Sequence, residues 1–401
     1  MRSSWLARGL SLALVALAGA TASPVAAAEL VVTLTYLGKA EPAPIPLSLV
    51  EPVLKDEGLK GAQQAIRDNQ TTGRFLKHDY RLVERLVPEG GDVAAAFAEA
   101  VAAGERLFVA DLRADELARL APAAEAAGAY LFNSRAPDED LRTDRCSKSV
   151  MHVAPSRAMK TDALAQYLAW KRWPRWLLVR GSLPADLAYA EAVKRSARKF
   201  GAKIVGEKVY EYVGDARRTD TGHVQIQNQI PVLTQGAPEH DVLVVADESD
   251  VFGEYLPYRT WDARPVAGTA GLVATAWSRV HEQWGGTQVQ RRFEKFSGRF
   301  MTERDFNAWL AVRAVGEAVT RVRDADPAKL HAYMVGDEFS LAAFKGQGLS
   351  FRKWNQQMRQ PMLLVTPRML VSVSPQDQFL HRRTPLDTLG FDEPETKCRL
   401  N

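Results

Sequence analysis

Residues 175–212, RWLLVRGSLPADLAYAEAVKRSARKFGAKIVGEKVYEY, decide the fold class of this chain. An apolar run at 175–181 is followed by a helical pattern at 184–200, and Gly201 ends that helix before a second β-branched run at 203–212. A strand, a helix and a strand in this order form the unit of a parallel sheet that is covered by helices. The stretch therefore predicts an α/β fold.

The same alternation extends over the rest of the chain. Further strands are expected at 30–36, 80–87, 106–111, 129–134 and 241–247, and helices at 92–103, 114–127 and 156–170. After Gly268 the pattern changes to two long helices, at 287–297 and 303–323, which are followed by two strands around Pro367 within 361–373. The two sets of βα units predict two Rossmann-like lobes with parallel sheets.

The first 28 residues have the pattern of a secretory leader. Residues 1–28 combine Arg2 and Arg8 with an apolar core at 9–20 and end in small residues up to Ala28. This pattern is typical of a signal peptide, so we expect cleavage near Ala28 and a periplasmic location. The apolar core is shorter than the roughly 20 residues that span a bilayer, and no later stretch is comparable. Direct membrane insertion is therefore not expected.

The size and charge of the mature chain limit its class. Removal of the leader takes two of the 52 basic residues and none of the 48 acidic ones, which leaves a net charge of 50 − 48 = +2. Because Lys and Arg are interspersed with Asp and Glu along the whole chain, nucleic acid is not an expected partner. The remaining 401 − 28 = 373 residues exceed the roughly 250 to 300 at which one hydrophobic core stops growing, which again favours two lobes.

The chain contains two cysteines, Cys146 and Cys398. In an exported protein they are expected to form one disulfide, which would tie the C-terminal tail to a loop far earlier in the chain. Two independent thiols are the alternative. Neither cysteine lies near the predicted cleavage point, which excludes a lipid-modified N-terminal cysteine.

Motifs of the common enzyme classes are missing from the sequence. It contains no GxxxxGK[ST] phosphate loop and no GxSxG nucleophile elbow. The stretch His281-Glu282-Gln283-Trp284 has no second histidine at the fourth position after His281, so it lacks the two-histidine face of a zinc protease. We therefore expect no enzymatic activity and no cofactor.

Polar residues follow several of the predicted strands. The loops are Asp111-Leu112-Arg113, Asn133-Ser134-Arg135 and Asp247-Glu248-Ser249-Asp250. Open α/β sheets bind ligands at the carboxyl ends of their strands, so these loops are candidate contacts for a polar ligand. The three acids at 247–250 also suit a cationic ligand or a hard metal ion that is bound through oxygen atoms. Each loop equally fits a simpler role, the capping of the helix that follows it.

The second half of the chain carries a more specific set of residues. These are Ala276-Trp277, His281-Glu282-Gln283-Trp284-Gly285, Arg292-Phe293, Gly298-Arg299 and the run AWLAVRAVGEAV at 308–319. Together with the exported start and the two βα lobes, the set resembles a type I periplasmic binding protein of the branched-chain amino acid binding family, which serves ABC transporters. Within that family it is similar to the subgroup encoded beside PQQ-dependent alcohol dehydrogenase systems.

The resemblance implies two Rossmann-like lobes that are joined by hinge strands and close over a ligand. Lobe 1 would contain residues 29–153 and 277–350, lobe 2 would contain 154–276 and 351–375, and 376–401 would form a C-terminal tail. The implied ligand contacts are Asp111, Asn133, Ser134 and Arg135 from lobe 1, and Ser182 and Glu248 from lobe 2. Glu248 would correspond to the acid that holds an amino group. The loop Ser182-Leu183-Pro184 lacks the family's tyrosine, so an ordinary amino acid is not the expected ligand.

The resemblance also implies partners and a function. The closed form would dock on a permease of the inner membrane whose partner ATPase drives uptake, and the binding protein would act as a monomer. Its ligand would be a small polar molecule connected with PQQ-dependent alcohol oxidation. Two other roles stay open at this point: a periplasmic sensor or accessory protein, and a binding protein for the uptake of a metal such as a lanthanide.

Overall fold

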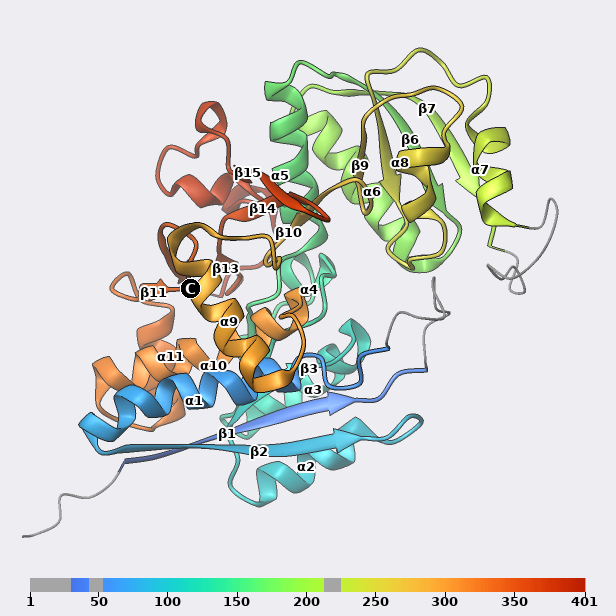
Figure 1. Ribbon diagram of the computed structural model, residues 1–401. Helices are drawn as coiled ribbons and strands as arrows, with labels where there is room; N and C mark the ends of the chain where they lie inside the picture. The colour runs from blue at the N-terminus through green and yellow to red at the C-terminus, as the bar shows by residue number, and fades with distance from the viewer. Residues whose placement is uncertain (1–29, 43–52, 213–224, 401) are drawn as a thin grey trace, which may run out of the picture.

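The computed structural model describes residues 30–42, 53–212 and 225–400. Two larger sheets form the cores of two lobes, and a small third sheet lies near the segments that connect them (Figure 1). The predicted α/β class with parallel sheets is confirmed. The leader predicted at residues 1–28 lies outside the described residues. None of the described helices is long and apolar enough to cross a membrane.

Lobe 1 is built on five parallel strands in the order β2-β1-β3-β4-β5. The strands are β1 (Leu30–Lys39), β2 (His78–Val87), β3 (Leu107–Asp111), β4 (Tyr130–Asn133) and β5 (Val150–His152). The helices between them are α1 (Leu59–Leu76), α2 (Val93–Ala102), α3 (Ala114–Ala126) and α4 (Asp140–Thr143). Strand β3 is buried on both faces, because Val109 packs toward α1 while Phe108 packs toward α2 and α3.

Lobe 2 is built on seven strands in the order β15-β14-β10-β9-β8-β6-β7, in which β14 runs antiparallel to both of its neighbours, β10 and β15, and the other pairs are parallel. The strands are β6 (Arg175–Gly181), β7 (Lys203–Tyr210), β8 (Val242–Ala246), β9 (Val266–Gly268), β10 (Leu272–Thr275), β14 (Met362–Thr366) and β15 (Met369–Ser374). The helices are α5 (Arg157–Trp170), α6 (Pro184–Lys199), α7 (Ile226–Thr234) and α8 (Leu256–Arg259). Alternate residues of β6 again face opposite helix pairs, with Leu178 toward α5 and α6 and Leu177 toward α7 and α8.

After β10 the chain returns to lobe 1 and adds three helices to it. They are α9 (Gly286–Ser297), α10 (Glu303–Val322) and α11 (Pro327–Met334). Helix α10 lies along α1, and its N-terminus is fixed by a capping box between Thr302 and Asp305. Its first turns carry Phe306, which stacks on Trp277 with ring centroids 4.5 Å apart and on Trp309 at 5.6 Å. This aromatic stack joins the end of lobe 2 to the core of lobe 1.

Three segments connect the lobes, after β5, after β10 and before β14. The third segment includes the small sheet of β11 (Leu341–Ala342), β12 (Gly348–Phe351) and β13 (Met358–Arg359). The Gln360 side chain donates to the carbonyl of Val153 at 2.9 Å, which ties the third segment to the first. The buried amine of Lys345 donates to the carbonyls of Ala276 and Pro361, which ties the third segment to the second. We call these three segments the hinge.

The C-terminal residues differ from the expected polar tail. Leu386 and Leu389 are buried, and Asp387 accepts a hydrogen bond from Arg352 Nε at 2.9 Å in an almost fully buried ion pair. Arg352 also donates to the carbonyl of Leu389 at 2.7 Å. The segment is therefore packed against the rest of the protein. Its few apolar residues are buried, and the buried Arg352 of the hinge is paired with Asp387 of the segment.

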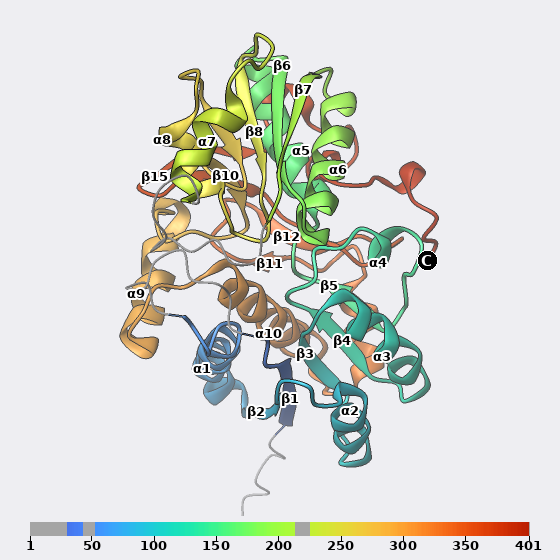
Figure 2. The same ribbon diagram turned by 90° about the vertical axis from the view of Figure 1, so that its right-hand side faces the viewer.

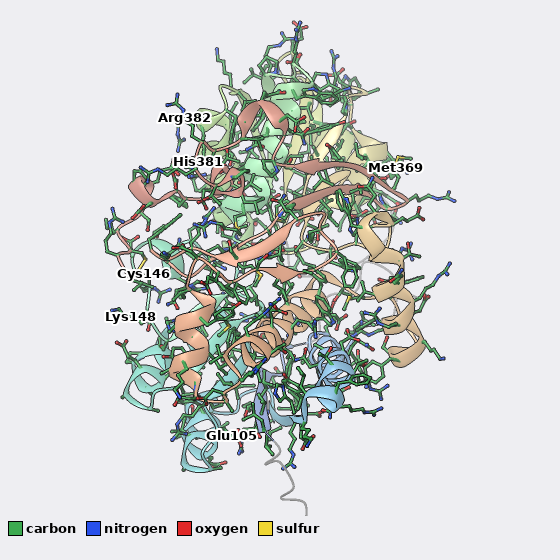
Figure 3. All side chains as sticks on the ribbon, turned by 90° about the vertical axis from the view of Figure 1, so that its left-hand side faces the viewer. Glu105, Cys146, Lys148, Met369, His381 and Arg382 are labelled. Atoms are coloured by element: carbon green, nitrogen blue, oxygen red, sulfur yellow. A yellow bond between two sulfur atoms is a disulfide. The ribbon has the colours of Figure 1, made fainter. Side chains whose placement is uncertain are left out.

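A disulfide joins Cys146 to Cys398, with the two Cα atoms 6.0 Å apart across 252 residues of chain (Figure 3). It fixes the end of the C-terminal segment to the loop between α4 and β5. A cross-link over such a long loop restricts the unfolded chain strongly, since the entropy of loop closure grows with loop length.

Replacing both cysteines, Cys146→Ser with Cys398→Ser, is expected to lower the free energy of unfolding by about 2–5 kcal/mol. Urea unfolding followed by tryptophan fluorescence measures the loss. Wild-type protein unfolded in the presence of reductant is the control and should match the double variant. Equal midpoints for oxidised and reduced protein would show that the bond does not constrain the unfolded chain.

Candidate ligand-binding site

The candidate contacts lie where strands of both sheets end. Asp111 ends β3 and Asn133 ends β4 in lobe 1, while Ser182 follows β6 and Glu248 follows β8 in lobe 2. In Figure 2 lobe 2 stands above lobe 1, with α10 and the short strands β11 and β12 between their sheets. Open α/β sheets bind ligands at the carboxyl ends of their strands, so the candidate contacts lie at the edge where a ligand site is expected.

Asp111 is buried and already has partners inside the protein. Its carboxylate accepts a hydrogen bond from the hydroxyl of Tyr36 and two from Arg304 Nε, at 2.7 and 3.0 Å. Burial, and then the charge of Asp111, raise the pKa of Tyr36 well above its ordinary value, so Tyr36 stays a donor. Asp111 therefore fixes the start of α10 against β3 and holds Arg304 at the sheet edge.

Asn133 and Ser134, two of the predicted ligand contacts, are buried and make hydrogen bonds within and next to their own loop. The Asn133 amide donates to the carbonyl of Ala136 at 2.8 Å and lies 3.0 Å from His152 Nδ1. Its oxygen accepts from the backbone N–H of Arg135 and of Ala136, at 3.1 and 2.8 Å. Both side chains are fully buried, and Ser134 donates to a carbonyl of β3. A carboxamide with all its hydrogen-bonding positions occupied has none left for a ligand.

Arg135 is the residue that this loop presents to the sheet edge. Its side chain is 22% exposed, and Nη1 donates to Glu41 Oε1 at 3.1 Å. The same carboxylate accepts a hydrogen bond from Arg113 Nε at 2.9 Å and forms a salt bridge with Arg113 Nη2 at 2.6 Å. Burial, followed by the charge of the nearby Arg304, lowers the pKa of Arg135, while the charges of Asp111 and Glu41 oppose the shift.

Glu248 belongs to a salt-bridge network that connects the lobes. It accepts a hydrogen bond from Arg157 Nε at 2.6 Å, and Arg157 Nη1 donates to Asp138 of lobe 1 at 2.9 Å. Burial raises the pKa of Glu248 while Arg157 opposes the rise. Ser182 accepts a hydrogen bond from the backbone N–H of Tyr212 at 3.0 Å, so it holds the ends of β6 and β7 together.

The first residue of the acidic loop after β8, Asp247, has a structural role. Asp247 is buried and accepts the backbone N–H groups of Val251, Phe252 and Gly253 at 3.0, 2.7 and 2.5 Å. It therefore caps the turn that follows, as the simpler interpretation of the loop predicted. Within the described part of the chain, no three His, Cys, Asp or Glu residues are grouped so that they could hold a metal ion.

Sequence patterns missed the partners of these residues. Glu41, Asp138, Arg157 and Arg304 come from other segments, and only the fold brings them to the candidate contacts. Arg157 follows Ser156, which caps α5, and Arg304 stands in the first turn of α10. A position at the start of a helix is therefore the sequence feature that these two arginines share. Capping does not require arginine, so this position did not mark them as partners of the candidate contacts.

A cavity lies away from these strand ends. It has a volume of about 530 Å³ and is lined by Arg279, Val280, Glu282, Gln283 and Phe300, and by the turn 367–370 between β14 and β15. The candidate contacts do not line it, and Figure 3 places Met369 of this turn at the surface. We place the candidate site at the strand ends, because charged side chains of both lobes meet there, whereas the cavity wall is formed by an exposed hairpin turn.

The chain was compared with known proteins. Residues 59–221 match the model of a family described as periplasmic binding protein. No curated protein matches the chain significantly in sequence.

Several solved structures share the fold at low sequence identity. A branched chain amino acid ABC transporter periplasmic ligand-binding protein from Burkholderia xenovorans is 15% identical, with a TM-score of 0.66 over 85% of this chain and 95% of the other. An ABC-type branched-chain amino acid transporter protein from Rhodopseudomonas palustris is 14% identical, with a TM-score of 0.66 over 92% and 100%. A leucine-, isoleucine-, valine-, threonine- and alanine-binding protein from Brucella ovis, in a closed conformation, is 14% identical, with a TM-score of 0.64 over 91% and 94%. The chain thus has the α/β fold of the type I periplasmic binding proteins, and its residues 59–221 match the periplasmic binding protein family.

Proposed function

We propose that the protein is the periplasmic solute-binding component of an ABC importer. It captures a small polar ligand between its lobes and delivers it, as a monomer, to a membrane permease with its ATPase. The observation that carries this proposal is the meeting of charged side chains from both lobes, in which Arg157 contacts both Glu248 and Asp138. Proteins of similar fold from Burkholderia xenovorans and Rhodopseudomonas palustris belong to ABC transporters, which supports the same role, and the leader pattern at residues 1–28 supports the location.

The physical basis of the function is a difference in contacts between two states. A ligand that reaches Arg135 on lobe 1 and the Arg157–Glu248 pair on lobe 2 gains all its contacts only when the lobes are together. It therefore shifts the population toward the closed state by its difference in affinity for the two states. The three connecting segments of the hinge are where this motion would take place.

The ligand is proposed to differ from an ordinary amino acid. One oxygen of Glu248 already accepts a hydrogen bond from Arg157 at 2.6 Å, and the loop at Ser182 has no tyrosine. The proposed link with PQQ-dependent alcohol oxidation is supported only by the resemblance within 276–319. The residues of that stretch that stack in the core, Trp277 and Trp309, stabilise the scaffold and do not contact the site.

The proposal is tested on protein taken directly from the periplasm. Native mass spectrometry is expected to reveal a bound small molecule, and that molecule should raise the unfolding temperature of protein that has been stripped of it. A ligand at a hundredfold excess over its Kd adds about 2.7 kcal/mol of stability. A ligand related to alcohols, aldehydes or acids would support the link with alcohol oxidation. Stripped protein that no periplasmic extract stabilises would argue against a binding protein.

Replacing Arg135→Ala together with Glu248→Ala is expected to abolish this ligand-induced stabilisation, about 2.7 kcal/mol at a hundredfold excess, and to leave the fold intact. Both side chains are partly exposed, at 22% and 23%, so their loss opens no cavity in the core. Thermal unfolding with and without the purified ligand measures the effect.

The matched control removes another charged pair, Arg81→Ala with Asp79→Ala, which is exposed on β2. This variant should keep the full stabilisation by ligand. If the Arg135 and Glu248 variant keeps it as well, the ligand does not bind at these strand ends.

A further inference from the structure

One carboxylate at the edge of the lobe 1 sheet is held in the manner of a bound ligand. Glu41 follows β1. Its two carboxylate oxygens contact Arg113 Nε and Nη2, at 2.9 and 2.6 Å, and Arg135 Nη1, at 3.1 Å. The three residues come from three segments that follow β1, β3 and β4. Two guanidinium groups around one planar carboxylate is the arrangement with which proteins recognise carboxylate ligands.

The charges around this carboxylate balance only while Glu41 is in place. The local cations are Arg113, Arg135 and Arg304, and the local acids are Asp111, Glu57 and Glu41. The sum is 3 − 3 = 0, and without Glu41 it is 3 − 2 = +1. A single negative charge from outside the protein would restore the balance.

Among the three acids, Glu41 is the one that can be exchanged. Asp111 is 1% exposed and is bonded to both Tyr36 and Arg304, so it cannot leave. Glu57 lies 3.9 Å from Arg304 and does not contact the other two arginines in any described bond. Glu41 is 22% exposed, and its partner Arg113 is 60% exposed. Ion pairs that water reaches contribute little net stability, so the contact can be replaced at small cost.

We propose that Glu41 is an internal competitor of the ligand, and that the ligand carries a carboxylate which replaces the Glu41 side chain on Arg113 and Arg135. The proposal rests on the proposed function, because it names the chemical class of the molecule bound at the same strand ends. In the free protein Glu41 balances the charge of the six groups and keeps Arg113 and Arg135 closed to weakly binding anions. A ligand must bind better than this internal carboxylate, which makes Glu41 a determinant of specificity.

The competition has a measurable size. When the binding-competent state is only a fraction of the population, the apparent Kd is the intrinsic Kd divided by that fraction. If Glu41 occupies the arginine pair for about nine tenths of the time, its removal strengthens binding about tenfold. Glu41→Gln keeps the size of the side chain and removes its charge. The effect must be confined to molecules that carry a carboxylate.

The experiment uses full-length mature protein that has been stripped of bound molecules, with acetate, benzoate and succinate as probes in calorimetric titrations. Glu41→Gln is expected to bind at least one probe about tenfold more tightly than wild type, while the corresponding primary alcohols or amides bind neither protein. Glu84→Gln, an exposed glutamate on β2 that pairs with Gln63, is the matched control and should behave as wild type. Arg113→Gln in the Glu41→Gln background should remove the gain. Glu41→Ala repeats the test if the glutamine variant does not fold.

Equal affinities of wild type and of both Glu41 variants for every probe would overturn the inference, and so would the absence of probe binding by either variant. Failure of the proposed function has a different signature. In that case periplasmic protein carries no small molecule and no extract stabilises it, whatever residue stands at 41. A periplasmic ligand without an anionic group would leave the transport function standing and would overturn the role of Glu41.

Discussion

Replacing Gly61 with alanine is expected to destabilise the protein by about 3 kcal/mol or more. Gly61 lies in the first turn of α1, where a Cβ atom would stand 1.9 Å from the carbonyl oxygen of Asp305 and 2.7 Å from its Cα. Those are backbone atoms at the start of α10, so no side-chain rotation relieves the contact. Helix propensity has the opposite sign, since alanine is better than glycine in a helix by about 1 kcal/mol. The steric term is larger, because α1 must separate from α10 to make room.

Urea unfolding of Gly61→Ala measures the loss. Thr72→Ala, an exposed substitution on the same helix, is the control and is expected to change the stability by less than about 0.5 kcal/mol. A stabilised Gly61→Ala variant would mean that propensity outweighs packing, and that the two helices are not in the close contact described here.

The same close contact explains why α1 was not expected from the sequence. An apolar stripe with helical spacing is the sequence pattern that predicts a helix. The buried face of α1 instead consists of small and polar residues. They are Gly61, Ala62, Gln64, Ala65, Asn69 and Gly73. Asn69 donates to the carbonyl of Val312 on α10 at 3.0 Å, so a polar side chain holds the helix pair together. The strands and helices that were predicted correctly, such as β6 and α6, carry their periodicity in apolar residues.

The candidate site shows the same division between local and distant information. Sequence alone places Asp111, Arg135 and Glu248 at strand ends, because apolar strands and the polar loops after them are local patterns. It does not supply their partners, since Arg304 lies 193 residues after Asp111 and Glu41 lies 94 residues before Arg135. It also does not distinguish Asn133, which organises its loop, from a residue that contacts a ligand. That distinction depends on which hydrogen bonds the fold has already used.

Raising the pH from 7 to 10 is expected to stabilise the wild-type protein relative to Lys345→Met. Lys345 is fully enclosed in the hinge, where its amine donates to the carbonyls of Ala276 and Pro361 and lies 5.3 Å from the ring of Phe306. Burial lowers the pKa of this amine from 10.5 to about 7, and Glu303 opposes the shift. Two carbonyls and one distant carboxylate do not replace the water that the ammonium loses.

The sign follows from the protons bound in each state. Between pH 7 and pH 10.5 the unfolded chain keeps a proton on Lys345 and the folded protein releases it, so the unfolded state binds more protons. The free energy of unfolding therefore rises with pH by about 1.4 kcal/mol per pH unit in this window. Below pH 7 both states are protonated and the contribution stays constant. Lys345→Met has no proton to release, so its difference from wild type isolates this one group.

The measurement is urea unfolding of both proteins at pH 7, 8.5 and 10, with the difference in free energy plotted against pH. Lys353→Met is the matched control for the loss of a lysine side chain, because that amine is exposed on the same segment. A constant difference for Lys345→Met would mean that the hinge holds a charged ammonium throughout. Its hydrogen bonds to the two carbonyls would then compensate fully for burial, and Lys345 would hold the second and third hinge segments together as a permanent ion.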